Sequence, residues 1–172
     1  KEPIVERSVD SMKKIVKTAE DYGVTYCVEV VNRYEGCILN TAAEAMDYIK
    51  RVDADNIGVL LDTYHMNIEE DSFRDAILTA GDKLLGLHTG DNNRRCPGRG
   101  HIDFDEIFKA LAEVNFKGRI VSELFVAKGG EVGRDIYVWR NLEKDLSEAA
   151  LDAEARHLLE YEKNLLTKYG MN

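Results

Sequence analysis

Short apolar segments alternate along this chain with longer segments in which apolar residues recur at helical spacing. The short segments, each expected to be a β-strand, are residues 26–31, 57–61, 84–87 and 120–126. Helical spacing is clearest in residues 5–22 and 147–169, which are expected to form the first and last helices. Strands that are apolar on both faces and are separated by helices predict a parallel sheet covered by helices.

Residues that commonly cap helices mark where the intervening helices begin. Thr41 followed by Glu44 is a capping box, and it predicts a helix from there to about residue 52. Ser72 is expected to begin a helix that ends near residue 81, and Asp103 to begin another.

An open doubly wound sheet and a (β/α) barrel both fit this alternation. No glycine-rich turn follows the first strand, so the dinucleotide-binding form of the open sheet lacks its main signature. A closed barrel typically needs about 250 residues and eight strands, whereas four strand–helix units are expected here. The polar residues at the strand ends, described below, favour the barrel, so the predicted fold class is α/β with TIM-barrel-type repeats, a C-terminal half-barrel of about four parallel strands. Residues 1–172 are expected to form a single domain that is incomplete at its N-terminus.

A half-barrel of this kind exposes two strand edges and the apolar side chains that would fill a barrel interior. Such surfaces need to be covered, so the chain is expected to be a homo-oligomer.

Each predicted strand carries one potential metal ligand, in it or directly after it. These ligands are Glu29, Asp62, His88 and Glu123. A buried carboxylate is costly unless it is paired or binds a metal, and the C-terminal ends of barrel strands converge on one face. Three carboxylates and one imidazole suit Mn²⁺ best, with Co²⁺ or Mg²⁺ as alternatives. The competing interpretation is that these residues are helix caps and loop-end polar groups that face solvent.

Composition excludes several classes of partner. The net charge of −9 and the scattered basic residues argue against nucleic acid. No apolar run approaches the roughly 20 residues that span a bilayer, so no membrane partner is expected. Three cysteines without a CxxC pair, Cys27, Cys37 and Cys96, favour a reducing cytoplasm.

Three segments closely resemble the ketose 3-epimerases, the family of the D-tagatose and D-psicose (allulose) 3-epimerases. They are residues 28–35 (VEVVNRYE), 61–70 (LDTYHMNIEE) and 88–95 (HTGDNNRR), and the likeness continues at residues 123–125 (ELF) and 135–140 (DIYVWR). The resemblance implies a (β/α)8 barrel with Mn²⁺ or Co²⁺ held at the four ligand positions named above. It also implies contacts to a sugar substrate from Glu35, His65 and Arg94. Asp91 and Leu124 stand where many members have Glu and Pro, so sugar contacts near those loops are expected to differ.

The implied reaction inverts a free ketose at C3 through a cis-enediolate. Inversion requires removal of the C3 proton from one face and return of a proton to the other, and such acid–base groups typically add about 10²- to 10⁴-fold. Glu29 and Glu123 lie on the first and fourth predicted strands and are expected to be the two catalytic acid/base groups. Asp62 and His88 are expected to be metal ligands only.

Four other functions remain open on the sequence. The same barrel and metal could serve a sugar-phosphate epimerase or an aldose-ketose isomerase. A metal-dependent endonuclease for abasic DNA is related by fold, but the acidic charge and the single ligand set argue against it. An inactive half-barrel that serves only as an assembly module is the non-enzymatic alternative.

Overall fold

Four parallel strands lie side by side in one sheet, in the same order as in the sequence. The computed structural model describes residues 1–171, and its strands are β1 (Tyr26–Glu29), β2 (Ile57–Asp62), β3 (Leu84–Thr89) and β4 (Arg119–Ser122). In a doubly wound sheet the strand order reverses at one point, so that strands that are not consecutive in the sequence lie side by side. Here every neighbour is the next strand along the chain. The structure therefore has the winding of a TIM-type barrel rather than that of an open sheet, as the sequence predicted.

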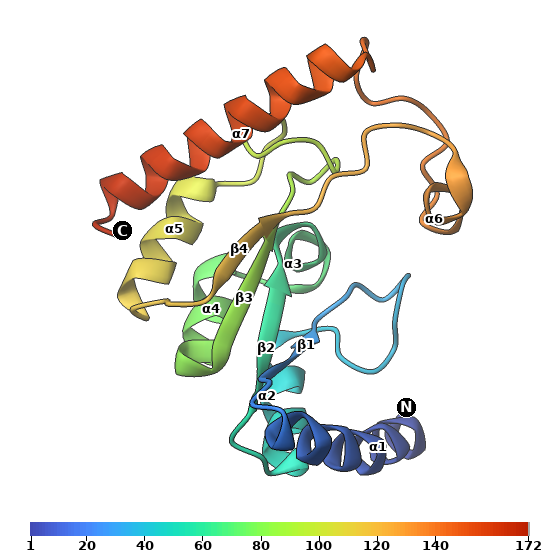
Figure 1. The fold of residues 1–172 in the computed structure, drawn as a ribbon, viewed down its shortest axis with the longest axis vertical. Helices are drawn as coiled ribbons and strands as arrows, with labels where there is room; N and C mark the ends of the chain where they lie inside the picture. The colour runs from blue at the N-terminus through green and yellow to red at the C-terminus, as the bar shows by residue number, and fades with distance from the viewer. Residues whose placement is uncertain (172) are drawn as a thin grey trace.

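Helices line one side of this sheet in chain order, except the short helix of residues 130–135, which lies apart from the sheet (Figure 1). They are α1 (Glu2–Asp21), α2 (Ala42–Val52), α3 (Thr63–Glu69), α4 (Phe73–Ala80), α5 (Phe104–Glu113), α6 (Gly130–Asp135) and α7 (Glu148–Lys168), with a 3₁₀ turn, η1 (Gly81–Lys83). Contacts join α1 to α2, α2 to α4, α4 to α5 and α5 to α7. In Figure 1, α7 lies along α5, near the upper ends of β3 and β4. No helix within residues 1–171 combines the length and apolar composition that a membrane crossing requires.

The predicted helix starts are confirmed by side-chain caps. Thr41 accepts the backbone N–H of Glu44, and Ser72 accepts that of Asp75. Asp103 accepts two backbone N–H groups at the start of α5. Each cap satisfies donors that the first turn of a helix leaves without partners, which is why these residues fix where the helices begin.

Two predicted strands are shorter in the structure. β1 ends at Glu29 rather than at residue 31, although the Val30 N–H still donates to the Leu60 carbonyl of β2; the Val31 N–H, on the other edge, donates to the carbonyl of Leu39. β4 ends at Ser122 rather than at residue 126, because the Phe125 N–H donates to the carbonyl of Arg94. Glu123 therefore follows β4 instead of interrupting it. Helices α3 and α6 were not predicted.

The two faces of the sheet are packed differently. Leu61 and Leu87 point toward the helices and are fully buried in the core. On the opposite face, Val121 is 50% exposed. At the free edge of β1 an apolar groove is lined by residues of both α1 and β1, among them Ile4 and Cys27. Within residues 1–171, no strand pairs with the outer edge of β1 or of β4. The inner face thus has the exposed apolar side chains expected of a half-barrel.

Candidate active site

The four predicted metal ligands come together at the C-terminal ends of the strands. One oxygen or nitrogen of each of Glu29, Asp62, His88 and Glu123 lies within 4.8 Å of the corresponding atoms of the others. Nδ1 of His88 is 3.4 Å from Oε1 of Glu29 and 3.7 Å from Oε2 of Glu123. Glu29 belongs to β1 and Glu123 follows β4, so the two glutamates reach the histidine from the two outer strands.

The Nδ1 atom of His88 is buried and has no hydrogen-bond partner among residues 1–171. A buried polar atom is rarely left unpaired without a functional reason. Here the unpaired nitrogen faces three carboxylate groups, and Oδ2 of Asp62 is 3.9 Å away. This donor set fits a divalent cation, which would satisfy the nitrogen and all three carboxylates at once.

The carboxylates and the imidazole change one another's protonation. The adjacent His88 ring is the main cause that lowers the pKa of Glu29, and Glu29 in turn raises the pKa of His88. Burial raises the pKa of Glu123, and the Asp62 carboxyl raises it further against the opposing effect of Arg94. The raised pKa of His88 reflects the carboxylates gathered around it, whose negative charge favours an added cation.

Asp62 uses its two carboxylate oxygens for different purposes. Oδ1 caps α3 by accepting the backbone N–H of Tyr64 at 2.7 Å and that of His65 at 3.4 Å. Oδ2 points toward the ligand cluster and lies 3.1 Å from Nη1 of Arg94. The cap fixes the side chain of a fully buried aspartate, so its second oxygen is held in place before any ligand binds.

Arg94 contacts a second predicted metal ligand, Glu123, in addition to Asp62. Its Nη1 is also 3.2 Å from Oε2 of Glu123, and its guanidinium lies over the ring of Tyr64 at 3.9 Å from the centroid. The backbone of Arg94 is left-handed, with φ of 60°, and its N–H donates to the carbonyl of Asp91. A non-glycine residue in this region has a strained backbone, and such strain is common at functional sites.

His65 is positioned by a residue that the sequence did not single out. Nδ1 of His65 faces both nitrogens of Asn32, the backbone N at 3.2 Å and Nδ2 at 2.7 Å. The backbone N–H can only donate, so Nδ1 accepts from it, and on the other side of the ring Nε2 lies 3.2 Å from Nη2 of Arg94, which is also a donor. Burial lowers the pKa of His65, consistent with a neutral ring.

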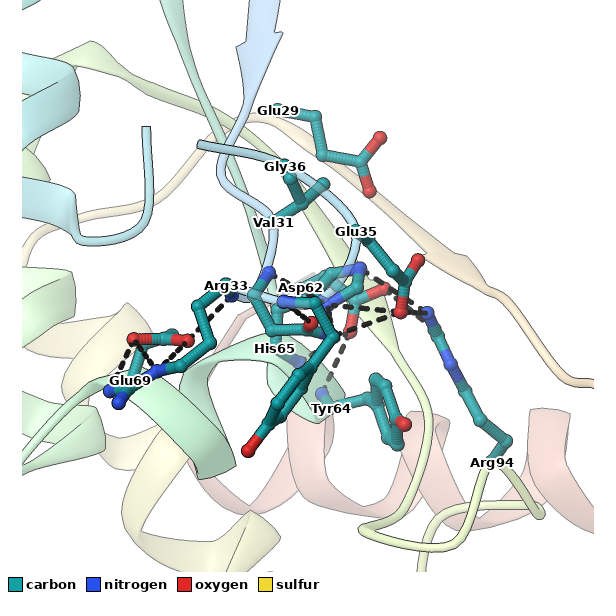
Figure 2. Close-up of polar contacts among 12 residues, drawn as sticks. Glu29, Val31, Arg33, Glu35, Gly36, Asp62, Tyr64, His65, Glu69 and Arg94 are labelled. Carbon is teal, nitrogen blue, oxygen red and sulfur yellow. Dashed lines mark hydrogen bonds and ion pairs between the residues drawn. The ribbon is translucent and has the colours of Figure 1, made fainter. Parts of the chain in front are cut away.

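The loop after β1 places Glu35 beside His65 and Arg94. Nδ2 of Asn32 donates to Oε1 of Glu35 at 2.9 Å, and Nη2 of Arg94 lies 4.0 Å from that oxygen. Figure 2 shows Arg94 directed toward Asp62 and Glu35, with Glu29 above them. Arg33 and Glu69 form a bidentate ion pair away from this cluster, which ties the loop to the end of α3. The three predicted sugar contacts thus border the ligand cluster on one side.

The loop after β3 is shaped by a buried aspartate. Asp91 accepts backbone N–H groups from Gly100 at 2.7 Å and from Ile102 at 3.1 Å. A Cβ at Gly100 would lie 2.1 Å from Oδ1 of Asp91, and a Cβ at Gly90 would lie 2.8 Å from the carbonyl of Glu123. Both glycines therefore permit approaches that no other residue allows. Asn32, Tyr64 and Asp91 all lie in or directly beside the segments that resembled the epimerases, which was the only sequence signal for them.

Comparisons with known proteins agree with this geometry. Residues 2–160 match the family described as xylose isomerase-like TIM barrel. The chain is 49% identical over 161 residues to the D-psicose 3-epimerase of Ruminiclostridium cellulolyticum and 46% identical over 160 residues to that of Agrobacterium fabrum. These matches cover 94% and 93% of the chain and 55% of each relative. The chain thus spans about half the length of the curated relatives it matches.

A solved structure of a D-psicose 3-epimerase is also similar to this chain. The D-psicose 3-epimerase of Clostridium cellulolyticum H10, crystallised with D-tagatose, superposes with a TM-score of 0.92 at 49% identity. The superposition covers 94% of this chain and 56% of that one. The fold, the matched sequence segments and the family model agree, and the chain belongs to the xylose isomerase-like TIM barrel family.

Proposed function

We propose that this chain carries the metal-binding and acid–base half of an enzyme that epimerises a free ketose at C3. The observation that supports this most strongly is the meeting of Glu29 and Glu123 from opposite outer strands on the two sides of His88. Ketose 3-epimerisation needs one proton acceptor and one proton donor on opposite faces of the same carbon. The similarity to D-psicose 3-epimerases supports the same reaction.

The four ligand residues are proposed to hold one divalent ion, Mn²⁺ in preference to Co²⁺ or Mg²⁺. The mainly oxygen donor set and the unpaired Nδ1 of His88 support this choice. When bound, such an ion supplies Lewis-acid stabilisation of negative charge that develops on a substrate oxygen.

The chain's own residues perform the proton transfers in this proposal. One glutamate, as a carboxylate, takes the C3 proton and becomes a carboxylic acid, which leaves a cis-enediolate. The other glutamate, as a carboxylic acid, returns its proton to the opposite face of C3 and becomes a carboxylate. The entering epimer decides which of Glu29 and Glu123 acts first, since the reaction is reversible. The guanidinium of Arg94 is proposed to donate to sugar oxygens, and His65, whose Nε2 lies 3.2 Å from Nη2 of Arg94, to contact the sugar beside it.

A second copy of this chain is proposed to cover the exposed inner face and the free edges of β1 and β4. The half-exposed Val121 and the apolar groove beside β1 support a homo-oligomer. In the active form, further strands of a full barrel are proposed to cover these surfaces in place of the second copy, because β1 to β4 line only one side of the ligand cluster.

A reducing cytoplasm is proposed as the compartment. Cys27, Cys37 and Cys96 are all free thiols, and burial raises the pKa of Cys96 to about 11. Free cysteines are typical of proteins kept in reducing surroundings.

The decisive experiment is a chimera in which this chain replaces the segment that it matches in the Ruminiclostridium D-psicose 3-epimerase. With Mn²⁺ it should interconvert D-fructose and D-psicose, and chelation should abolish turnover. Glu29→Gln and Glu123→Gln should each abolish epimerisation, while one of them can still exchange the C3 proton with solvent deuterium.

The chimera also distinguishes between the alternative functions. Turnover of phosphorylated ketoses in preference to free ones would assign a sugar-phosphate epimerase, and formation of aldoses would assign an isomerase. A folded, metal-loaded chimera that acts on no sugar would leave the assembly module as the correct interpretation. Near-normal turnover in either glutamine variant would overturn the two-base mechanism.

A further inference from the structure

Glu162 is a buried glutamate on α7 that belongs to no part of the site described so far. Glu162 is 8% exposed, and its Oε1 lies 2.5 Å from Oγ1 of Thr89 and 3.1 Å from Oγ of Ser122. The two hydroxyl oxygens are themselves 2.8 Å apart. Three side chains from α7, β3 and β4 therefore form one closed hydrogen-bonded cluster.

The cluster lies directly behind two predicted metal ligands. Thr89 and Ser122 are register partners at the ends of β3 and β4, and the Glu123 N–H donates to the Thr89 carbonyl at 3.0 Å. Successive side chains along a strand point to opposite faces of the sheet. Thr89 and Ser122 face α7, so His88 and Glu123, one position away on each strand, face the candidate metal centre.

Burial of the Glu162 carboxyl costs free energy, which indicates that its polar contacts have a role in the structure. Burial is the largest influence on this carboxyl and raises its pKa. None of the ion pairs within residues 1–171 includes it, although Lys117 and Lys163 line the same groove at the surface. A leucine of similar size would pack there at lower cost, but it would leave both hydroxyls without this partner.

We propose that Glu162 is a positioning residue of the metal centre, which holds the ends of β3 and β4 together from the helix side and so fixes His88 and Glu123 relative to each other. This inference rests on the proposed function, because it takes those two residues as metal ligands. Groups that orient metal ligands typically change metal affinity by about 10- to 100-fold when they are removed. Glu162 would act one step further out, through the backbone of the two strands.

The test is Mn²⁺ binding to the full chain, measured by the electron paramagnetic resonance signal of free Mn²⁺. Glu162→Leu should weaken binding about tenfold. Glu162→Gln keeps an acceptor oxygen for the hydroxyls and should restore the affinity to within about threefold of the unmodified chain. Glu160→Leu makes the same chemical change at an exposed position of the same helix, and it should leave the affinity unchanged.

A second variant covers the case in which Glu162→Leu does not fold, as judged by circular dichroism. Ser122→Ala removes one hydroxyl and leaves α7 intact, and it should weaken Mn²⁺ binding by about fivefold, the equivalent of one hydrogen bond. Unchanged affinity in a folded Glu162→Leu chain, or in Ser122→Ala, overturns the positioning role.

Failure of the proposed function gives a different result from failure of this inference. If the unmodified chain binds no Mn²⁺, the metal centre and the positioning role are both wrong. If it binds Mn²⁺ normally and Glu162→Leu does so too, only the positioning role is wrong. If Glu162→Leu weakens binding but the chimera described above turns over no ketose, the positioning role stands and the epimerase assignment falls.

Discussion

Nη1 of Arg94 lies 3.1 Å from Oδ2 of Asp62, and both side chains are almost fully buried. The guanidinium is thus within hydrogen-bond distance of a predicted metal ligand, and it also reaches Glu123 at 3.2 Å. A fixed positive charge at this distance offsets part of the negative charge of the cluster. Arg94 is therefore expected to have two opposite effects on the proposed enzyme, because its charge would oppose metal binding while its N–H groups would be donors for the sugar.

Replacement of Arg94 by Met should separate these two effects. Loss of the positive charge should tighten Mn²⁺ binding by about fivefold or more, because two unit charges about 4 Å apart interact by about 1 kcal/mol even in water. The same variant in the chimera should bind ketose more weakly and show a raised KM. Calorimetric titration with Mn²⁺ measures the first effect and steady-state kinetics the second. Arg156→Met, at an exposed position of α7, is the matched control. Weaker metal binding in Arg94→Met would show that the guanidinium supports the metal centre instead of opposing it.

Asp62→Asn should remove metal binding without removing the helix cap. An asparagine oxygen can still accept the backbone N–H groups of Tyr64 and His65, but it brings no negative charge to the cluster. We expect at least a tenfold loss of Mn²⁺ affinity with little change in thermal stability. His88→Ala should lose metal as well.

Elemental analysis of purified protein and a thermal unfolding curve measure both quantities. Asp103→Asn makes the same exchange at the cap of α5, away from the cluster, and should retain full metal content. Unchanged metal content in both Asp62→Asn and His88→Ala would rule out the ligand set.

Stability should depend on pH through Glu162. Burial raises the folded-state pKa of this carboxyl above its ordinary value of 4.5, so the folded chain binds the proton more tightly than the unfolded chain does. The resulting contribution to stability is fully present below pH 4.5 and is lost as the pH rises through the folded-state pKa. Glu162→Gln does not titrate and should show no such loss.

The free energy of unfolding of Glu162→Gln should therefore exceed that of the unmodified chain by a margin that grows with pH, on the order of 1 kcal/mol per pKa unit. Urea unfolding at several pH values between about 4 and 8 measures the difference. A difference that stays constant across this range would mean that the carboxyl titrates alike in the folded and unfolded chain.

Self-association should depend on the inner face of the sheet. Val121 is 50% exposed there, so Val121→Glu would place a charge in the proposed contact between copies and should shift the chain toward monomer in light scattering. Val132→Glu, at a site on α6 that is 59% exposed, should leave the size unchanged. A monodisperse monomer in the unmodified chain would contradict the proposed homo-oligomer.

Most helix boundaries and the order of elements followed from local sequence signals. Thr41, Ser72 and Asp103 were read correctly as caps because a cap depends only on neighbours within one turn. The ends of β1 and β4 were placed too late. For β4 the reason is that the Phe125 N–H donates to the carbonyl of Arg94, a residue distant in sequence. Helix α3 was missed because it is short and its cap, Asp62, was interpreted only as a ligand.

By itself, the sequence determined the alternation of elements, the four ligand-type residues at strand ends and the likeness to the ketose 3-epimerases. These depend on residue type and spacing, which are local properties. Only the tertiary structure decided that Arg94 reaches Asp62, that Asn32 contacts Nδ1 of His65, and that Glu162 joins the ends of β3 and β4. The residues of these contacts are 32, 33 and 73 positions apart. Such contacts are decided by the winding of the sheet and the packing of α7, which no pattern within a short stretch of chain specifies.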